Sequence, residues 1–489
     1  MSSTFPARGL SPISESISES LNSSFVSMKP LHRRIAVGFF WFFLLAVVIM
    51  AMINQTVGAE WVIPALCLSV LVKIVPLLLY QSEYGWFHPL IFGALYSIIG
   101  FLRSFPTYAW GLEWNDGLPG YSLEKLAGLV SLGLVLGVIG QIEYYVGFIW
   151  GPRLPIPQLH FVQRGYIGGK AILIVILVLL LFAIYISSQG GLVAHLLFLA
   201  QGRRFLINEG LLTGEWDVLV RFGILACLLW LVTDHNAIRQ PLFWISAILA
   251  LISQYFVIGS RSAPIIFLII GLIAWMMKER KFSATAAIIF SVVAVALIGL
   301  LGDFRTSIWS GSVDWSVLTE ADLSTSIKRG ISEMQYRSSG QNPLYPILAR
   351  VPDEIPLEYG RSYLAVFGTP IPRAFWPDKP RTTGNVIGEI FLNTLAPIPP
   401  DPIAEAYWNF HIPGILAVHF IYGVFHQWLI RLFQRYRQEP IVIIFYSYTL
   451  FWMNPTVLSI VSWLQVLFLL VLLSLLFTKI SLQTIVSPP

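Results

Sequence analysis

Long apolar segments alternate with short polar connections through most of this 489-residue chain. A helix needs about 20 apolar residues to cross a bilayer. Twelve segments reach or approach that length. They predict an all-α fold, a polytopic membrane helix bundle of about twelve spans. The predicted spans are 35–53, 61–80, 89–101, 126–150, 171–187, 218–232, 241–258, 263–277, 284–301, 412–430, 440–452 and 458–477.

The composition agrees with a membrane protein. Hydrophobic residues make up 56% of the chain and charged residues 12%, whereas soluble proteins are about 25% charged. These proportions exclude a soluble enzyme, a disordered protein and a disulfide scaffold. Both cysteines, Cys67 and Cys227, lie inside apolar segments, which argues against a disulfide or a metal ligand.

Lysine and arginine are unevenly distributed between the two sides of the predicted bundle. With twelve spans, fifteen of them lie in segments on the side of the N-terminus, and five lie in the short segments on the other side. Because Lys and Arg accumulate in cytoplasmic loops, both termini are expected in the cytoplasm. The net charge of +5 then needs no nucleic-acid partner.

The chain divides into four parts. Residues 1–34 are rich in Ser and are expected to form a disordered cytoplasmic tail. Residues 35–301 contain spans one to nine, and residues 412–489 contain the last three spans and the cytoplasmic end. Residues 302–411 form a large periplasmic loop that is too long for a passive connector. We expect it to form a partly helical cap that carries the function.

Arginines on the outer side oppose the usual charge bias. Arg261 lies between two apolar segments, Arg305 follows Gly-Asp-Phe, and Arg373 lies in a Pro-rich turn. Guanidinium groups bind phosphate and pyrophosphate through paired hydrogen bonds, so the group predicts an anion site. For any one arginine, the alternative is a side chain that reaches the interface or pairs with an acid. Further outer cations are Arg203, Arg337, Arg361 and Lys379.

Two carboxylates precede the span at 412–430. Asp401 and Glu405 are four residues apart, so in a helix they share one face, which we expect to point at the outer membrane surface. They fit either a general base or an acidic pair at a helix N-terminus. The chain has no P-loop, no Gly-x-Gly-x-x-Gly and no His-Glu-x-x-His. We expect neither a metal nor a cofactor.

Three blocks resemble one known family. They are LEYGRSYLAVFGTPIPRAFWPDKP at 357–380, AEAYWNFHIPG at 404–414 and GSRSAP at 259–264. Together with many spans and one large outer loop late in the chain, they resemble bacterial oligosaccharide repeat-unit polymerases, the O-antigen polymerases of the Wzy type. His411 stands where that family has Gly.

The resemblance implies a membrane glycosyltransferase of the GT-C type in the bacterial inner membrane. Its donor and acceptor are oligosaccharides linked to undecaprenyl pyrophosphate, and a chain-length regulator is a further expected partner. The expected roles are catalysis for Glu405, Arg373 and Arg261, pyrophosphate binding for Arg305, Lys379, Arg361, Arg337 and Arg203, and sugar binding for Asn409, Tyr407 and Tyr363.

Three other functions stay open. An O-antigen ligase shares the fold and the arginines, although the Trp-Pro-Asp-Lys-Pro block favours the polymerase. A transporter commonly shows internal repeats, and this sequence shows none. In a membrane scaffold without chemistry, the outer arginines would be dispersed.

The charge distribution predicts where the C-terminus lies. A reporter enzyme that works only in the cytoplasm should be active when it is fused after Pro489. A reporter enzyme that works only in the periplasm should be inactive at the same position. Activity only outside the cell membrane would contradict the predicted topology.

Overall fold

The computed structural model describes most of the chain between Pro30 and Leu482. The described residues are 30–53, 61–80, 84–97, 121–163, 167–200, 214–258, 262–309, 314–319, 322–339, 342–368, 376, 383–393 and 398–482.

Helices dominate the described residues, as the sequence predicts. The long helices are α2 (Pro30–Ile53), α3 (Val62–Leu79), α5 (Leu123–Trp150), α6 (Ile167–Ser188), α9 (Gly214–Thr233), α10 (Pro241–Ile258), α11 (Ser262–Glu279), α12 (Ala284–Trp309), α18 (Pro402–Arg435), α19 (Pro440–Trp452) and α20 (Val457–Phe477). The shorter ones are η1 (Gly85–Phe87), α7 (Leu192–Ala200), η3 (Ala237–Arg239), α13 (Ser316–Thr319), α14 (Leu323–Ser339), α15 (Leu344–Arg350), α16 (Arg361–Gly368) and α17 (Thr383–Leu392). Residues 89–97 are also helical.

Where the structure describes them, the predicted apolar segments fall on helices. Among the described residues, six helices are long and apolar enough to cross a membrane: α3, α5, α6, α12, α18 and α20. Shorter apolar helices lie at 218–233, 241–257 and 440–452. The chain is therefore a multi-pass helical membrane protein.

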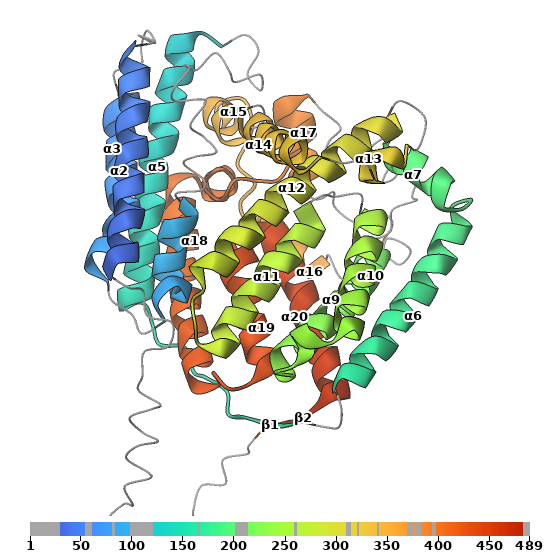
Figure 1. The fold of residues 1–489 in the computed structure, drawn as a ribbon. Coiled ribbons are helices and arrows are strands. Elements are labelled where there is room, and N and C mark those ends of the chain that lie inside the picture. The colour runs from blue at the N-terminus through green and yellow to red at the C-terminus, as the bar shows by residue number, and fades with distance from the viewer. Residues whose placement is uncertain are drawn as a thin grey trace, which may run out of the picture.

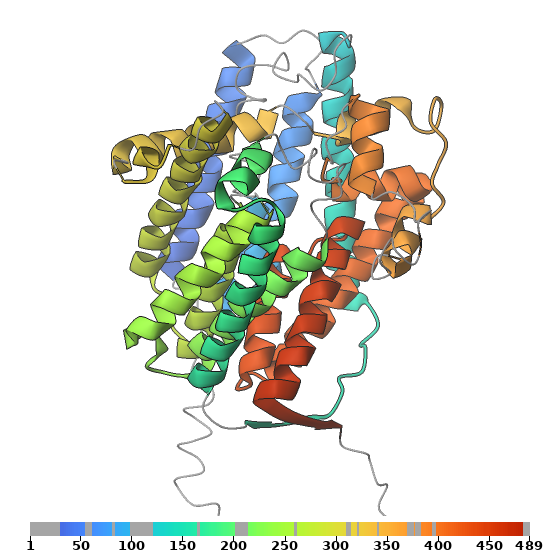
Figure 2. The same cartoon turned by 90° about the vertical axis from the view of Figure 1, so that its right-hand side faces the viewer.

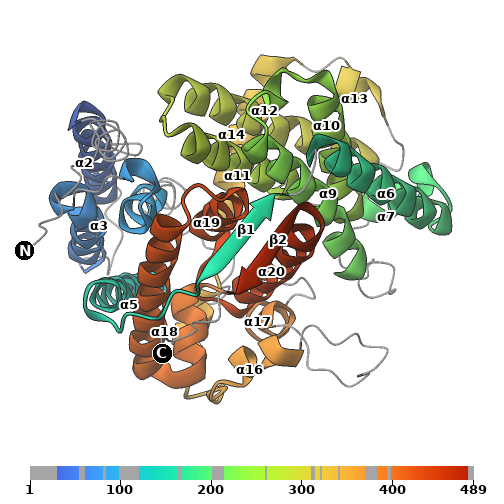
Figure 3. The same cartoon turned by 90° about the horizontal axis from the view of Figure 1, so that it is seen from below.

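One two-stranded sheet departs from the all-α prediction. Strand β1 (Leu159–Gln163) pairs antiparallel with β2 (Thr478–Leu482), and Leu159 lies opposite Leu482. Figure 3 shows the two strands side by side beneath the bundle. The strands join the connection after α5 to the segment after α20, and the charge distribution assigned these two segments to the same side of the membrane. Figure 1 shows α13, α14, α15 and α17 at the opposite end from β1 and β2.

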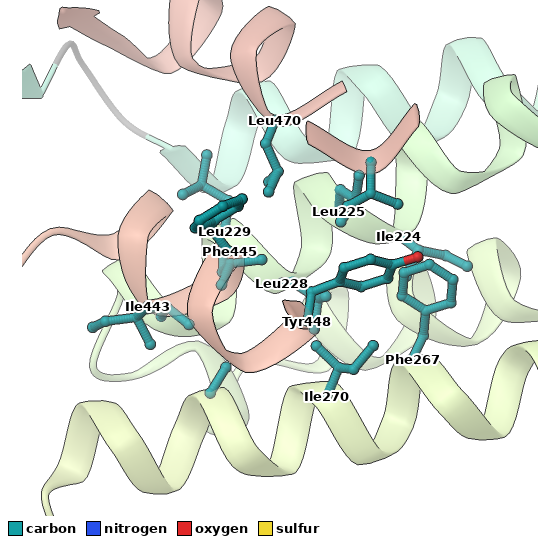
Figure 4. Packing of buried hydrophobic residues seen from close by; sticks show 14 of the residues in the cluster. Ile224, Leu225, Leu228, Leu229, Phe267, Ile270, Ile443, Phe445, Tyr448 and Leu470 are labelled. Carbon is teal, nitrogen blue, oxygen red and sulfur yellow. The ribbon is translucent and has the colours of Figure 1, made fainter. Parts of the chain in front are cut away.

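The largest core cluster of the described residues includes apolar side chains of α5, α6, α9, α10, α11, α18, α19 and α20. Figure 4 shows Leu228 and Leu229 of α9 among Ile270 of α11, Tyr448 of α19 and Leu470 of α20. Helices in a bilayer associate through close van der Waals packing, since lipid tails are as apolar as these side chains. This cluster holds the C-terminal helices that carry the candidate site.

Glycines bring α18 against α5. A Cβ atom added at Gly147 of α5 would collide with the carbonyl oxygen of Phe420, and one added at Gly423 of α18 would collide with that of Tyr144. Gln427 also donates from Nε2 to the carbonyl of Phe148 at 2.8 Å. Figure 2 shows the C-terminal segments, in orange and red, beside the cyan α5. Close backbone contact between these two helices therefore sets the position of α18.

Gly423→Ala should lower the free energy of unfolding, because the added methyl group forces α5 and α18 apart. Overpacking of this kind costs about 1–3 kcal/mol. The matched control is Gly137→Ala on α5, where an added Cβ would meet nothing within 4 Å. Thermal unfolding in detergent measures both, and equal melting temperatures would contradict the close packing.

Candidate functional site

Helix α18 contains a sharp break. Phe410 (φ −142°, ψ 20°) and His411 (φ 58°, ψ −146°) leave the helical conformation. An unbroken helix would separate residues eight apart by about 12 Å. Here a Cβ atom added at Gly414 would collide with the carbonyl oxygen of Ala406. The chain therefore turns back at 410–411, and the short first part of α18, residues 402–409, lies against the start of the long second part.

The segment before α16 caps the short first part of α18. The backbone N–H groups of Glu358 and Tyr359 donate to the carbonyls of Trp408 and Asn409, each at 3.0 Å. These carbonyls lack partners within their own helix because the helix ends there. The blocks at 357–380 and 404–414, which the sequence singled out separately, are thus joined by main-chain hydrogen bonds.

Asn409 is the centre of this junction. Its Nδ2 donates to Ser362 Oγ at 2.7 Å and to the Glu405 carbonyl at 2.8 Å, and its Oδ1 accepts from the Gly360 N–H at 3.0 Å. Both N–H groups of the amide are therefore engaged. The predicted sugar contact could use only the remaining lone pair of Oδ1, so the observed bonds give Asn409 mainly a structural role.

Glu405 lies inside the junction and is 0% exposed. The prediction that it points at the outer membrane surface is wrong, because its carboxylate caps α20 instead. Oε2 accepts the N–H of Val457, the first residue of α20, at 2.9 Å. A negative charge is stabilised at a helix N-terminus. The other oxygen, Oε1, is buried without a hydrogen-bond partner among the described residues.

Tyr363 supplies a second unpartnered atom beside Glu405. Its hydroxyl group is buried and has no hydrogen-bond partner in the described part of the chain. Burial, and then the nearby Glu405 carboxylate, raise the pKa of Tyr363, so the phenol stays protonated. The side-chain hydroxyl groups of Thr383 and Ser362 also act as hydrogen-bond donors to the carboxylate. The site thus has a free carboxylate oxygen and a free phenol in one buried place.

Asp401 and Tyr407 have separate roles. Asp401 caps the N-terminus of α18, where its Oδ1 accepts from the N–H groups of Ile403 at 2.9 Å and Ala404 at 3.1 Å. The helix-capping interpretation of Asp401 is therefore the one that the structure supports. Tyr407 bonds through its hydroxyl to His411 Nε2 at 2.7 Å, across the break in α18.

The structure describes only some of the predicted cationic site residues. Arg361 is the first residue of α16, and its side chain is exposed beside the junction. Arg305 lies on α12 and Arg337 on α14, with side chains outside the described part. Arg203, Arg261, Arg373 and Lys379 lie outside the described residues. Their convergence on one site stays a prediction.

Three groups of the junction were not predicted as site residues. Ser362 lies inside the block at 357–380, which the sequence had already singled out, so Ser362 could have been predicted as a site residue. Thr383 lies at the start of α17 and the Val457 N–H at the start of α20. No local pattern marks them, because only the tertiary fold brings these helix starts to Glu405.

No group of three or more His, Cys, Asp and Glu residues suited to a metal ion occurs among the described residues. Comparison of the chain with protein-family models, curated proteins and solved structures finds no match in any of the three.

The backbone conformation of His411 predicts that glycine at this position gives a more stable protein than alanine. A non-Gly residue in such a sparsely populated conformation costs about 1–3 kcal/mol. His411→Gly and His411→Ala both remove the bond to Tyr407, but Gly alone tolerates this conformation. The Gly variant should therefore unfold at a higher temperature than the Ala variant. Equal melting temperatures would show that the backbone at 411 is unstrained.

Proposed function

We propose that this protein is a glycosyltransferase that polymerises lipid-linked oligosaccharide repeat units at the outer face of the bacterial inner membrane. One observation carries the proposal. The two sequence blocks that resemble the polymerase family dock around the buried Glu405 carboxylate, which lies near the Tyr363 hydroxyl. Among the described residues, neither Glu405 Oε1 nor that hydroxyl has a hydrogen-bond partner.

The chemistry of these two atoms favours a hydroxyl ligand. Glu405 Oε1 needs a donor, and the Tyr363 phenol can donate to a ligand oxygen. A sugar hydroxyl satisfies both atoms, whereas a phosphate would be repelled by the carboxylate. Glu405 is therefore proposed as the general base for the acceptor hydroxyl. Tyr363 fits the predicted role in sugar binding, and Tyr407 is proposed to line the same side.

The reaction transfers the donor glycan to that hydroxyl. The bond between the donor C1 and the pyrophosphate oxygen breaks, a bond from C1 to the acceptor oxygen forms, and the acceptor proton moves to Glu405. Undecaprenyl pyrophosphate leaves with its added negative charge. Fixed cations stabilise such charge, and Arg261, Arg305, Arg373, Lys379 and Arg361 are proposed for this task, with Arg203 and Arg337 as further contacts.

The membrane arrangement proposed here has about twelve spans in a GT-C type bundle. The three shorter apolar helices then cross together with the six long ones, and α2, α11 and the predicted span at 89–101 complete the twelve. The β1–β2 sheet fits this arrangement, because it places the segments after α5 and α20 together and so requires an even number of spans between them. A chain-length regulator is proposed as a partner at the periplasmic face.

Two alternatives differ in their products. A ligase would use the same donor and transfer the glycan to a lipid-A core. A transporter is favoured by one observation, the broken helix α18, because discontinuous helices line many transport sites. Formation of new glycosidic bonds by the purified protein excludes the transporter, and extension of the repeat-unit lipid itself excludes the ligase.

Glu405→Gln should stop chain growth without loss of protein. The amide keeps an acceptor oxygen for the Val457 N–H but cannot act as a base, whose contribution is typically about 100- to 10,000-fold. Single repeat units should accumulate on the lipid carrier, as measured by gel separation of the lipid-linked glycans. Glu354→Gln, an exposed acid of the same outer segment, is the control. A wild-type rate in Glu405→Gln would show that Glu405 is not the base.

Arg373 tests the proposed pyrophosphate clamp separately. Arg373→Ala should reduce polymerisation by about 100- to 1,000-fold. Arg373→Lys keeps the charge but loses the paired hydrogen bonds of the guanidinium group, so it should also impair chain growth. Full activity of the Lys variant would show that pyrophosphate binding needs only a positive charge at position 373. Full activity of the Ala variant would show that Arg373 does not bind the pyrophosphate.

A further inference from the structure

Helix α16 has two contrasting faces. Ser362 and Val366 are buried, and Ser362 accepts the hydrogen bond from Asn409. On the other side, Leu364 is 66% exposed and Phe367 is 79% exposed. These two side chains are three residues apart and are neighbours on the helix surface. A short helix at the candidate site thus presents a strongly apolar face outward.

The surroundings of α16 identify what covers this face. Figure 3 shows α16 at the periphery of the bundle, and the helix packs against α20. Helix α20 is one of the membrane-spanning candidates. Its outward side chains Leu458, Leu464 and Phe468 are also exposed and apolar. Lipid must cover the exposed apolar face of α20, and α16 packs against that helix, so lipid is also the environment expected for the apolar face of α16.

The charge pattern of α16 fits the same environment. Arg361, at the start of the helix, has an exposed side chain, and the exposed aromatic ring of Tyr359 lies two residues earlier. Tyrosine and arginine are suited to the boundary between acyl chains and headgroups, where an apolar body and a polar end are both accommodated.

We propose that α16 is an interfacial helix embedded in the bilayer leaflet on the side of α13–α17. Leu364 and Phe367 lie among acyl chains, and Arg361 lies at the level of the lipid phosphates. Tyr363, on the same helix, faces the interior beside Glu405. If the proposed polymerase function holds, on which this last consequence rests, a lipid-borne substrate reaches Glu405 sideways from the bilayer, past α16.

Spin labels test this placement without reference to activity. Single cysteines replace Leu364 and Phe367 in the full-length protein, after Cys67→Ser and Cys227→Ala, and the labelled protein is reconstituted in vesicles of phosphatidylethanolamine and phosphatidylglycerol. Power saturation compares accessibility to oxygen, which concentrates in acyl chains, and to a water-soluble nickel chelate. Phe468→Cys on α20 is the lipid-facing control, and Glu354→Cys is the aqueous control.

The expected result is that labels at 364 and 367 match the control at 468, with high oxygen and low nickel accessibility. High nickel accessibility, as at 354, would place α16 in water and overturn the proposal. Low accessibility to both reagents would show that protein covers this face, and would also overturn it. Either negative result leaves the Glu405→Gln assay unaffected, so this proposal and the polymerase function fail separately.

Discussion

A buried carboxylate needs hydrogen-bond donors, and the way Glu405 meets this need organises the outer half of the molecule. Its Oε2 takes the first N–H of α20, so the short first part of α18 must end beside the start of α20. Asn409, one turn further on, then ties that part to Gly360 and Ser362. Three segments far apart in the sequence meet because each contributes polar groups that apolar surroundings would otherwise leave unpaired. Among the described residues, two buried atoms of this junction have no hydrogen-bond partner, Glu405 Oε1 and the Tyr363 hydroxyl.

The helices were predictable because their signal is local and large. A run of apolar residues long enough to cross a bilayer has few other uses, and the predicted segments fall on helices. The short predicted span at 89–101 is described as a helix only over 89–97. The β1–β2 sheet was not predictable, since its strands are five residues each and lie more than 300 positions apart. Pairing of such short segments depends on the bundle that brings them together.

The candidate site was predictable in its residues and not in its geometry. The spacing of Asp401 and Glu405 indicated one helical face, and the structure confirms a helix that begins at Pro402. Their spacing alone does not show that Asp401 caps its own helix, α18, whereas Glu405 caps α20. The break at His411 explains the difference, because it turns the first part of α18 inward. His411 adopts φ 58°, a backbone conformation that glycine adopts at lower cost than other residues.

The proposed function depends on Glu405 Oε1 and the Tyr363 hydroxyl together binding the acceptor hydroxyl of a sugar. A cryo-electron microscopy structure of the protein in lipid nanodiscs, with a lipid-linked repeat unit bound, tests this most directly. One sugar hydroxyl is expected within about 2.5–3.0 Å of both atoms. The proposed function would be contradicted by a sugar bound elsewhere while Oε1 and the Tyr363 hydroxyl are bonded to each other or to other groups of the protein.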